Sequence, residues 1–512
     1  MNAARSLQRA NWRAVLLSDL GVLVLLALAR VVIQSLTNGQ YGWHRDELAL
    51  LDDARSLAWG YVAYPPLAPF VARVGLELFG PSLIGLRLFS VIAQSAALVL
   101  TGLMVKALGG PRWAQIAAAL LVGANPASLA FGNNIMYVSF DYLWWVLAAY
   151  CTVRLLQSED GRWWLGIGAA LGLGAMSKFT IAFLAVGLVV GVLVTPARRW
   201  LRSPWLWAGA GLALLIYLPN LIWQAQHSFV TFEFLGSIHE RDVRIGRADE
   251  FFIEQLLFNS NPLTLVLIPL GLYGYLFHPV GKPFRVLGWM YVVPLALMVV
   301  TQARGYYLTP AYPHLIAGGA AFLAHWLSSR PPARAAALRG WVNGFAWYGA
   351  LVTMAIVLRL GPVGSLQWDI ATTLNGEQVE EVGWPDMVGA VAEVYQSLPA
   401  EERARAGILV GNYGEAGAVN LYGPALGLPR AISGINSYWP RGYGSPPPEP
   451  VIVWGYPADR MNSIFTGCRY ARDIPNPLGV ENEETTTHRE IFICRAPIAP
   501  WPQFWEENRY FG

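Results

Sequence analysis

Apolar stretches long enough to cross a lipid bilayer recur through the first two thirds of the chain. A membrane-spanning helix needs roughly 20 mostly apolar residues. We find eleven such stretches, at 14–36, 84–106, 114–131, 140–157, 163–176, 179–195, 205–222, 256–278, 287–301, 306–327 and 341–360. Charged residues make up 13% of the 512 residues, about half the roughly 25% typical of soluble domains. This excludes a soluble enzyme. The 55% of hydrophobic residues and the absence of a short repeat exclude a disordered chain, a collagen and a coiled coil, and we expect an α-helical polytopic membrane protein with about 11 transmembrane helices.

The basic residues between these stretches predict the orientation of the chain. With the N-terminus in the cytoplasm, the inner segments hold 15 lysines and arginines, among them Arg5, Arg9 and Arg13, against 8 in the outer loops. Inner loops are enriched in these residues, so we expect a multi-pass protein of the cell (inner or plasma) membrane with a cytoplasmic N-terminus. The first stretch lacks a small-residue cleavage site and is expected to remain as a span. An odd number of spans places the C-terminal part outside.

From about Gly361 the apolar stretches stop, and glycine, proline, asparagine and acidic residues become frequent. Short strand-like runs at 407–412, 450–456 and 491–494, with a helical pattern at 390–398, are typical of an α/β domain. We therefore predict two domains. Residues 1–360 form a membrane domain, and residues 361–512 form an extracytoplasmic soluble α/β domain.

Two long outer loops, residues 37–83 and 223–255, have amphipathic patterns typical of segments that lie along a membrane surface. The first holds the adjacent acids Asp46 and Glu47, close to the first span. Neighbouring carboxylates point in different directions on a helix, so one can face a cavity while the other binds a neighbour. A carboxylate in a dry cavity has a raised pKa and can act as a base near neutral pH. The alternative is a solvated acidic pair beside the membrane.

Two further charges lie at the expected outer ends of later spans. Asp141 enters the apolar run LWWVLAAY, where a carboxylate is costly unless it is used or paired. Alternatively, Asp141 caps the N-terminus of that helix. Lys178 follows a glycine-rich helix and either neutralises a phosphate or only extends its ammonium to the interface.

Arg304 precedes Tyr306, Tyr307 and Tyr312 on the expected outer side. Arginine binds phosphate oxygens through two parallel hydrogen bonds, and the tyrosines offer an aromatic surface for a sugar ring or a polyprenyl chain. The alternative is an interfacial aromatic belt with an arginine that reaches the headgroups.

These five charged positions are far apart in the sequence, but the predicted topology places all of them on one face of the membrane. Asp46, Glu47 and Asp141 supply carboxylates for proton abstraction, whereas Lys178 and Arg304 supply cations for a leaving phosphate. The combination indicates transfer of a group from a phosphate-linked donor.

The histidines and cysteines form no metal-binding motif. His44, His227 and His239 lie in outer loops at spacings that do not match HExxH, and Cys468 and Cys494 either pair in an oxidising exterior or stay free. No phosphate-binding glycine loop, nucleophile elbow or basic stripe supports a nucleotide or nucleic acid partner. We expect no cofactor, although the loop acids could hold a divalent cation near a phosphate.

The chain resembles the family 39 glycosyltransferases, which have the GT-C type of fold and include protein O-mannosyltransferases and the aminoarabinose transferases of lipid A. The matching segments are HRDELALLDDARSLAWGYVAYPPLAPFVARV, NNIMYVSFDYLWW, GAMSKFT, LPNLIWQAQH and RGYYLTPAYPHLIAGGA. They cover roughly residues 15–330, and the acidic pair followed by WGYVAYPPL is the most specific part. The resemblance implies a GT-C-like fold and an inverting transfer, without a nucleotide, from a polyprenyl- or dolichyl-phosphate-linked sugar at the outer membrane face.

The resemblance also implies a role for each position. Asp46 is the carboxylate that activates the acceptor, Glu47 completes the acidic pair, and Asp141 orients the acceptor or assists the base. Lys178 contacts the donor phosphate. Arg304 stands where relatives often have lysine, which binds phosphate with a different geometry. The residues expected to line the substrate site are His44, Tyr61, Tyr64, Tyr306 and Tyr307.

Two other functions remain open. A transporter or flippase of lipid-linked sugars would use the same cations and aromatic residues, but would need inner-face sites and an internal repeat, and we find no convincing repeat. A non-catalytic scaffold whose C-terminal domain binds a partner would leave the clustered charges unexplained. The sequence does not name the sugar, and the acceptor is an unknown glycan, lipid or protein.

Overall fold

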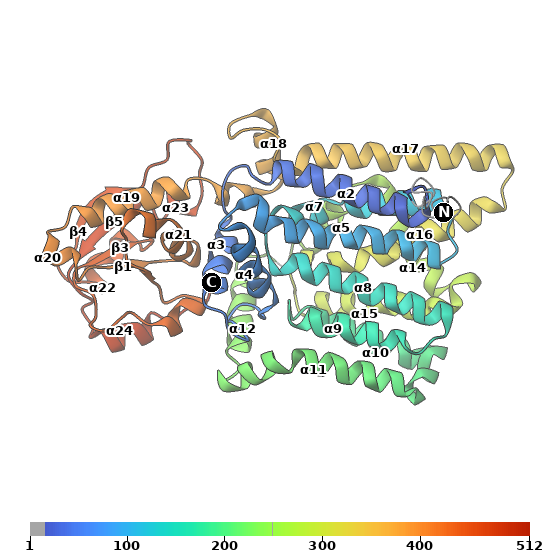
Figure 1. The fold of residues 1–512 in the computed structure, drawn as a ribbon, viewed down its shortest axis with the longest axis horizontal. Coiled ribbons are helices and arrows are strands. Elements are labelled where there is room, and N and C mark those ends of the chain that lie inside the picture. Colours follow the sequence, from blue (N-terminus) through green and yellow to red (C-terminus); the bar gives the residue numbers. More distant parts are fainter. Residues whose placement is uncertain (1–15, 248) are drawn as a thin grey trace, which may run out of the picture. The chain divides into compact units, whose positions relative to one another are not determined.

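The computed structural model describes residues 16–247 and 249–512 and is mostly helical (Figure 1). By its contacts the chain forms two compact units. The helical unit consists of Met1–Thr37, Arg87–Leu221 and Asp242–Leu358, and the mixed unit consists of Asn38–Leu86, Ile222–Arg241 and Arg359–Gly512. The first two residues of the predicted first span, and the basic residues Arg5, Arg9 and Arg13, lie outside the described residues.

The long helices of the helical unit run side by side (Figure 1). The helices of this part of the chain are α2 (Asp19–Thr37), α5 (Leu83–Ala107), α6 (Arg112–Gly123), α7 (Pro126–Asn133), α8 (Tyr137–Ser158), α9 (Trp163–Ala175), α10 (Ile181–Val194), α11 (Pro204–Gln226), α13 (Phe251–Phe258), α14 (Pro262–Leu276), α15 (Arg285–Val300), α16 (Tyr312–Ser328) and α17 (Pro332–Val357). Among the described residues, five helices are long and apolar enough to cross a membrane, or up to eight if each bent pair is one span. The chain is therefore an integral membrane protein, and the number of eleven spans stays a prediction.

Asn–Pro dipeptides break two of the predicted spans. α6 and α7 are bent by 55°, and Asn125 caps α7 by accepting hydrogen bonds from the backbone N–H groups of Ala127 and Ser128. α13 and α14 are bent by 111°, and Asn261 caps α14 directly before Pro262. Asparagine stabilises a helix start, and proline fits the first turn but not a helix interior. Each dipeptide therefore begins a new helix where the hydropathy pattern predicts one continuous span.

α14 and α16 pack backbone against backbone. A Cβ atom at Gly319 of α16 would lie 2.1 Å from the carbonyl oxygen of Leu267, and one at Gly271 of α14 would lie 2.1 Å from that of Leu315. Small residues allow membrane helices to approach this closely. The contact fixes the position of α16 against α14. The 3₁₀ turn η3 (Gly305–Ala311), which carries two of the predicted site tyrosines, directly precedes α16.

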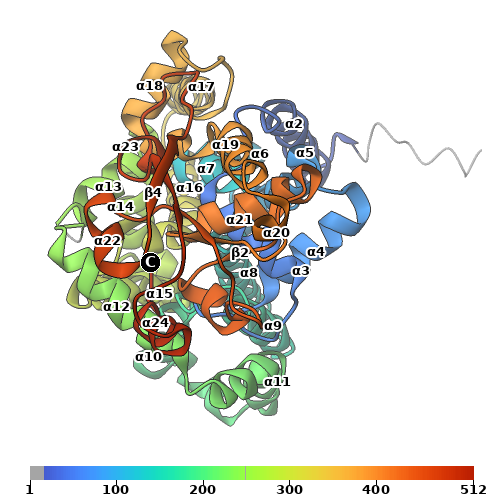
Figure 2. The same ribbon diagram turned by 90° about the vertical axis from the view of Figure 1, so that its left-hand side faces the viewer.

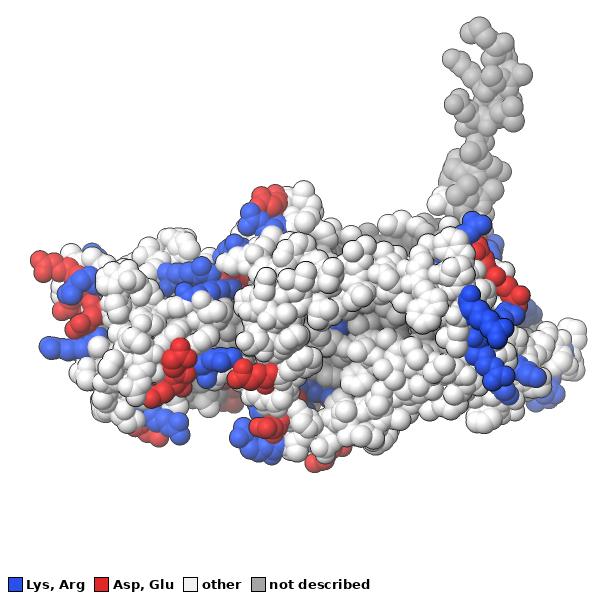
Figure 3. Space-filling model, turned by 90° about the horizontal axis from the view of Figure 1, so that it is seen from below, with Lys and Arg blue, Asp and Glu red and all other residues white. Residues whose placement is uncertain are grey.

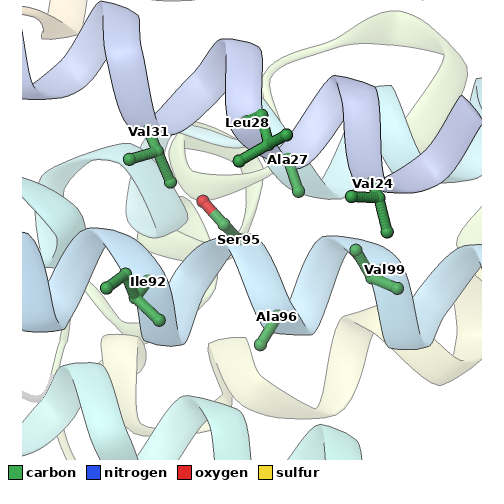
Figure 4. Close-up of a pocket in the computed structure, with 8 residues that line it drawn as sticks. All are labelled: Val24, Ala27, Leu28, Val31, Ile92, Ser95, Ala96 and Val99. Atoms are coloured by element: carbon green, nitrogen blue, oxygen red, sulfur yellow. The ribbon is translucent and has the colours of Figure 1, made fainter. Parts of the chain in front are cut away.

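The surface of the helical unit in Figure 3 is almost free of charged side chains between its two ends. Apolar side chains on this unit remain exposed, including Leu28 of α2 and Leu215 of α11, as expected for a surface that faces hydrocarbon. A shallow groove between α2 and α5 (Figure 4) is lined by Val24, Ala27, Leu28, Val31, Ile92, Ser95, Ala96 and Val99. None of the predicted site residues lines this groove.

The mixed unit contains a five-stranded sheet with the order β2-β1-β3-β5-β4. The strands are β1 (Gly407–Val410), β2 (Ala431–Ile432), β3 (Val451–Trp454), β4 (Arg469–Asp473) and β5 (Glu490–Cys494). β1 is parallel to β2 and β3, whereas β5 is antiparallel to β3 and β4. The predicted C-terminal α/β fold, with its three strand-like runs, is confirmed.

The mixed unit also contains short helices. They are α18 (Leu366–Leu374), α19 (Trp384–Gln396), α20 (Ala400–Arg403), α21 (Tyr413–Tyr422), α22 (Met461–Ile464), α23 (Glu483–Thr486) and α24 (Trp501–Glu507). α19 and α21 cover one face of the sheet, whereas α22 and α24 cover the other (Figures 1 and 2). Cys468, just before β4, and Cys494, at the end of β5, form a disulfide, which is one of the two states that the sequence left open.

The two predicted outer loops contain helices. The first holds α3 (Arg45–Arg55) and α4 (Leu67–Phe79), and the second holds α12 (Val230–Arg244). The first loop, and the second as far as Arg241, belong to the mixed unit by their contacts. Their position along a membrane surface, and separate roles for residues 1–360 and 361–512, stay predictions.

Candidate functional site

Lys178 lies in the helical unit, between the end of α9 and the start of α10, and is only 8% exposed. Its Nζ atom lies 3.8 Å from the ring centroid of Tyr307, 4.5 Å from that of Tyr306 and 5.4 Å from that of Tyr137. In the part of the chain that the structure describes, Lys178 forms no ion pair. The structure thus brings together three of the predicted site residues, as a buried ammonium against aromatic faces, an arrangement that attracts cations.

Burial lowers the pKa of the Lys178 ammonium to about 7. The carboxylate of Asp141 acts in the opposite direction, and the nearby guanidinium of Arg304 lowers the pKa further. Burial penalises the charged form of a lysine. A bound anion would favour that form, so an anionic group is the natural ligand of this ammonium.

Asp141 is the fifth residue of α8 and is buried. It does not cap the helix, because the N-cap is Met136; the capping alternative is wrong. The Thr180 hydroxyl donates a hydrogen bond to Asp141 Oδ2 (2.7 Å). Since Thr180 is two residues beyond Lys178, this bond ties the acid to the segment that carries the ammonium. The sequence analysis did not single out Thr180.

Arg304 lies directly before η3 and forms a two-point ion pair with Asp242 of α12. Its Nε atom is 2.5 Å from Asp242 Oδ2, and its Nη2 atom is 3.0 Å from Oδ1. Both side chains are largely buried. The guanidinium expected to bind phosphate is therefore engaged by an acid of the second loop, and this acid is not among the predicted site residues.

The acidic pair of the first loop lies in the mixed unit, in the first turn of α3. His44 caps this helix: its Nδ1 atom accepts a hydrogen bond from the Asp46 N–H (3.2 Å), and the Glu47 carboxylate accepts one from the His44 N–H (2.9 Å). Glu47 is fully buried. Asp46 is partly exposed, and within the described residues its side chain forms no hydrogen bond or ion pair. Glu47 therefore has a structural role, and that Asp46 faces a substrate cavity stays a prediction.

Three residues predicted to line the substrate site contact α3 or its partners. Tyr64 donates a hydrogen bond from its hydroxyl to Asp53 Oδ2 (2.6 Å), and the Tyr61 hydroxyl lies 3.1 Å from the Asp53 carbonyl oxygen. The second ring nitrogen of His44 lies 3.4 Å from Glu377. These contacts support the helix, and contact with a substrate stays a prediction.

Asp52 and Asp53, near the end of α3, form a second acidic pair that sequence reasoning passed over. Both side chains are buried and form ion pairs with the guanidinium of Arg441. Asn420 also donates to Asp52 Oδ2 (3.0 Å). The two acids stand in the segment ELALLDDAR, but their basic partner lies almost 390 residues away, so only the fold reveals the pairing.

Comparison with known proteins agrees with the fold. Residues 63–223 match the family model described as dolichyl-phosphate-mannose-protein mannosyltransferase, and this segment contains Asp141 and Lys178. The resemblance to the family 39 glycosyltransferases is confirmed. The chain is 26% identical over 257 residues to the lipid A galacturonosyltransferase RgtD of Rhizobium johnstonii. It is 29% identical over 169 residues to the undecaprenyl phosphate-alpha-4-amino-4-deoxy-L-arabinose arabinosyl transferase 1 of Pseudomonas fluorescens.

The two alignments cover 49% and 31% of this chain, and 53% and 30% of the respective relatives. The chain thus matches about half of one curated relative and about a third of the other. Among solved structures, ArnT from Cupriavidus metallidurans bound to undecaprenyl phosphate matches with a TM-score of 0.55 and 16% identity, over 92% of this chain and 97% of that chain. The likeness confirms the expected GT-C-like fold.

Proposed function

We propose that the protein is a membrane glycosyltransferase that moves a sugar from a polyprenyl-phosphate-linked donor to an acceptor on the extracytoplasmic face. The observation that carries this proposal is the buried Lys178 ammonium, held against tyrosine faces and free of an ion pair among the described residues. Such a cation is suited to a lipid-linked phosphate, because both the site and the ligand are largely withdrawn from water. The name of one curated relative, the undecaprenyl phosphate-alpha-4-amino-4-deoxy-L-arabinose arabinosyl transferase 1, points to the same class of donor.

In the proposed reaction, the Asp46 carboxylate takes the proton of an acceptor hydroxyl. The hydroxyl oxygen forms a bond to the anomeric carbon on the face opposite the phosphate, so the configuration inverts. The bond between that carbon and the phosphate oxygen breaks, and its electron pair stays on the polyprenyl phosphate. Lys178 and Arg304 stabilise the developing negative charge, an effect worth about 10²–10³ in rate for one such group in other enzymes.

Asp141 orients the acceptor or assists the base in this proposal. Tyr306 and Tyr307 keep the ammonium away from water and present rings to the donor. The polyprenyl chain is accommodated by membrane lipid. The reaction as proposed uses no nucleotide and no metal ion, since the leaving group is already a phosphate and its charge is met by two side chains.

The proposed orientation places the N-terminus in the cytoplasm and residues 361–512 outside. The excess of basic residues in the inner segments supports it. The disulfide between Cys468 and Cys494 supports it independently, because disulfides persist mainly in oxidising compartments. Both observations fit a cell-envelope enzyme with an acceptor outside the membrane.

The test uses the full-length protein in proteoliposomes with undecaprenyl phosphate that carries a hexose, a hexuronic acid or an aminopentose. Acceptors are lipid A, a cell-wall glycan and a hydroxyl-bearing peptide, and mass spectrometry detects glycosylated product and released undecaprenyl phosphate. We expect turnover of one donor, and a loss of at least about 10²-fold for Asp46→Asn. Asp386→Asn, an exposed acid of α19, is the matched control.

Near-normal transfer by folded Asp46→Asn would exclude Asp46 as the base. The alternative function, transport of lipid-linked sugars, predicts a different result. In that case donor labelled on one leaflet would reach the other leaflet of the vesicle, and no product would form with any acceptor.

A further inference from the structure

The helix that carries Asp46 packs directly on the C-terminal α/β domain. α3 lies along α21 in the mixed unit, and glycines of α21 face it. A Cβ atom at Gly417 would lie 2.5 Å from the backbone carbonyl carbon of Leu48, and one at Gly414 would lie 2.8 Å from the Cβ atom of Arg45. The two helices therefore touch at the backbone, without an intervening side chain on α21 at these positions.

The first turn of α3 is tied to the C-terminal part by charge. The Arg45 guanidinium lies 2.5 Å from a Glu483 oxygen and 3.6 Å from a Glu380 oxygen. It also lies over the ring of Tyr413, 5.1 Å from its centroid. Arg45 is the residue next to Asp46, so this contact fixes the backbone at the proposed base.

The other end of α3 is held by a second set of contacts. The Arg441 guanidinium bridges Asp52 and Asp53, and Arg55 donates to the carbonyl oxygen of Asn420 (3.0 Å). Among the acids of α3, only Asp46 forms no hydrogen bond or ion pair within the described residues. All the other acids of this helix serve to hold it.

We infer that the C-terminal α/β domain positions Asp46 by clamping α3, with Gly417 and Arg441 as positioning residues. This inference rests on the proposed function, and it assigns a role to the part of the chain that lacks a recognisable motif. Misplacement of a reacting group by about 1 Å can cost about 10²-fold in rate. A methyl group at Gly417 would force a movement of that size, because non-bonded carbon atoms need about 3.5–4.0 Å.

The experiment compares Gly417→Ala with Gly389→Ala in proteoliposomes. Gly389 lies in α19 of the same unit, and a Cβ atom there would meet nothing within 4 Å. For the donor that wild-type protein turns over, we expect kcat to fall about 10-fold to 100-fold in Gly417→Ala and to stay within about twofold in Gly389→Ala. Affinity for undecaprenyl phosphate should not change in either variant, because Lys178 and Arg304 belong to the helical unit.

A second variant separates positioning from folding. If Arg441 acts through Asp46, Arg441→Gln should lower kcat in the wild-type background but leave the residual rate of Asp46→Asn unchanged. Wild-type kcat in Gly417→Ala would overturn the inference. A parallel loss of affinity for undecaprenyl phosphate in Gly417→Ala and Arg441→Gln would also overturn it. An active Asp46→Asn would instead overturn the proposed function, so the two failures are distinguishable.

Discussion

The ammonium of Lys178 lies against the face of Tyr307, with 3.8 Å between Nζ and the ring centroid. The ring supplies attraction without neutralising the charge, so the cation is desolvated and still available to an anion. A carboxylate in the same place would compete with a phosphate ligand. The pairing therefore suits a site that binds an anionic lipid, releases it after reaction and binds the next.

Replacing the ammonium should weaken binding of the lipid phosphate. We expect Lys178→Met to reduce the affinity for undecaprenyl phosphate about 10-fold to 100-fold, since a hydrogen bond to a charged group contributes about 1.5–3 kcal/mol. Lys282→Met removes an exposed lysine of the same unit and should have no effect. Titration of purified protein with undecaprenyl phosphate measures both, and equal affinities would exclude Lys178 from the phosphate site.

Binding of the lipid phosphate should weaken as the pH rises. The pKa of Lys178 is lowered by burial to about 7 in the unliganded protein, so the ammonium loses its proton near neutrality and with it the attraction to phosphate. We expect the Kd for undecaprenyl phosphate to increase between about pH 6 and pH 8. Lys178→Arg keeps its charge over this range and should remove the weakening, so that only the second ionisation of the phosphate itself, at about pH 6, shapes its profile. A wild-type loss of affinity with rising pH in that variant would assign the loss to another group.

The ring of Tyr307 should affect the pH at which the binding of undecaprenyl phosphate weakens. Tyr307→Phe keeps the aromatic face and should leave the profile near that of wild type. Tyr307→Leu removes an attraction worth about 0.5–2 kcal/mol, which further disfavours the protonated form of Lys178. The midpoint of the binding profile should therefore shift to lower pH in Tyr307→Leu by about 0.4 to 1.5 units, as measured by the same titration. Coincident profiles of the two variants would show that the ring face does not hold the ammonium.

Removal of the ion pair between Arg304 and Asp242 should strengthen the binding of undecaprenyl phosphate, whereas the changes above weaken it. Asp242→Asn removes the negative charge that engages the guanidinium. If Arg304 binds the donor phosphate, we expect undecaprenyl phosphate to bind several-fold more tightly to this variant. The thermal midpoint should fall, because the variant leaves a largely buried charge unpaired. Weaker binding together with a lower midpoint would mean that the pair only stabilises the fold.

The sequence predicts the regular elements well, because apolar periodicity and composition are local signals. It also singles out Asp141 and Lys178, since a charge at the edge of an apolar helix is costly wherever that helix packs. The breaks at Asn125 and Asn261 were visible as Asn–Pro dipeptides, but the apolar residues on both sides outweighed them. Local signals of this kind need no knowledge of the fold.

The partners of the charged residues could not be predicted in the same way. Asp242 stands among other charged residues in an amphipathic loop, and nothing in its pattern selects it as the partner of Arg304. The contact between α3 and α21 joins segments more than 360 residues apart and depends on glycines, which carry no side-chain signal. Which acid is structural, and which has no partner within residues 16–247 and 249–512, therefore follows from the fold alone.

The contact between α14 and α16 predicts a stability difference between two glycines. Gly319→Ala would place a methyl carbon 2.1 Å from the carbonyl oxygen of Leu267, and relief of that overlap should cost about 1–3 kcal/mol. Gly344→Ala, on the exposed side of α17 where a Cβ atom meets nothing within 4 Å, should be neutral or stabilising by up to about 1 kcal/mol. Thermal unfolding in detergent compares the two. Because α16 follows η3, Gly319→Ala should also weaken undecaprenyl phosphate binding through the displaced tyrosines, and a destabilised variant with wild-type affinity would show that the turn is held independently of α16.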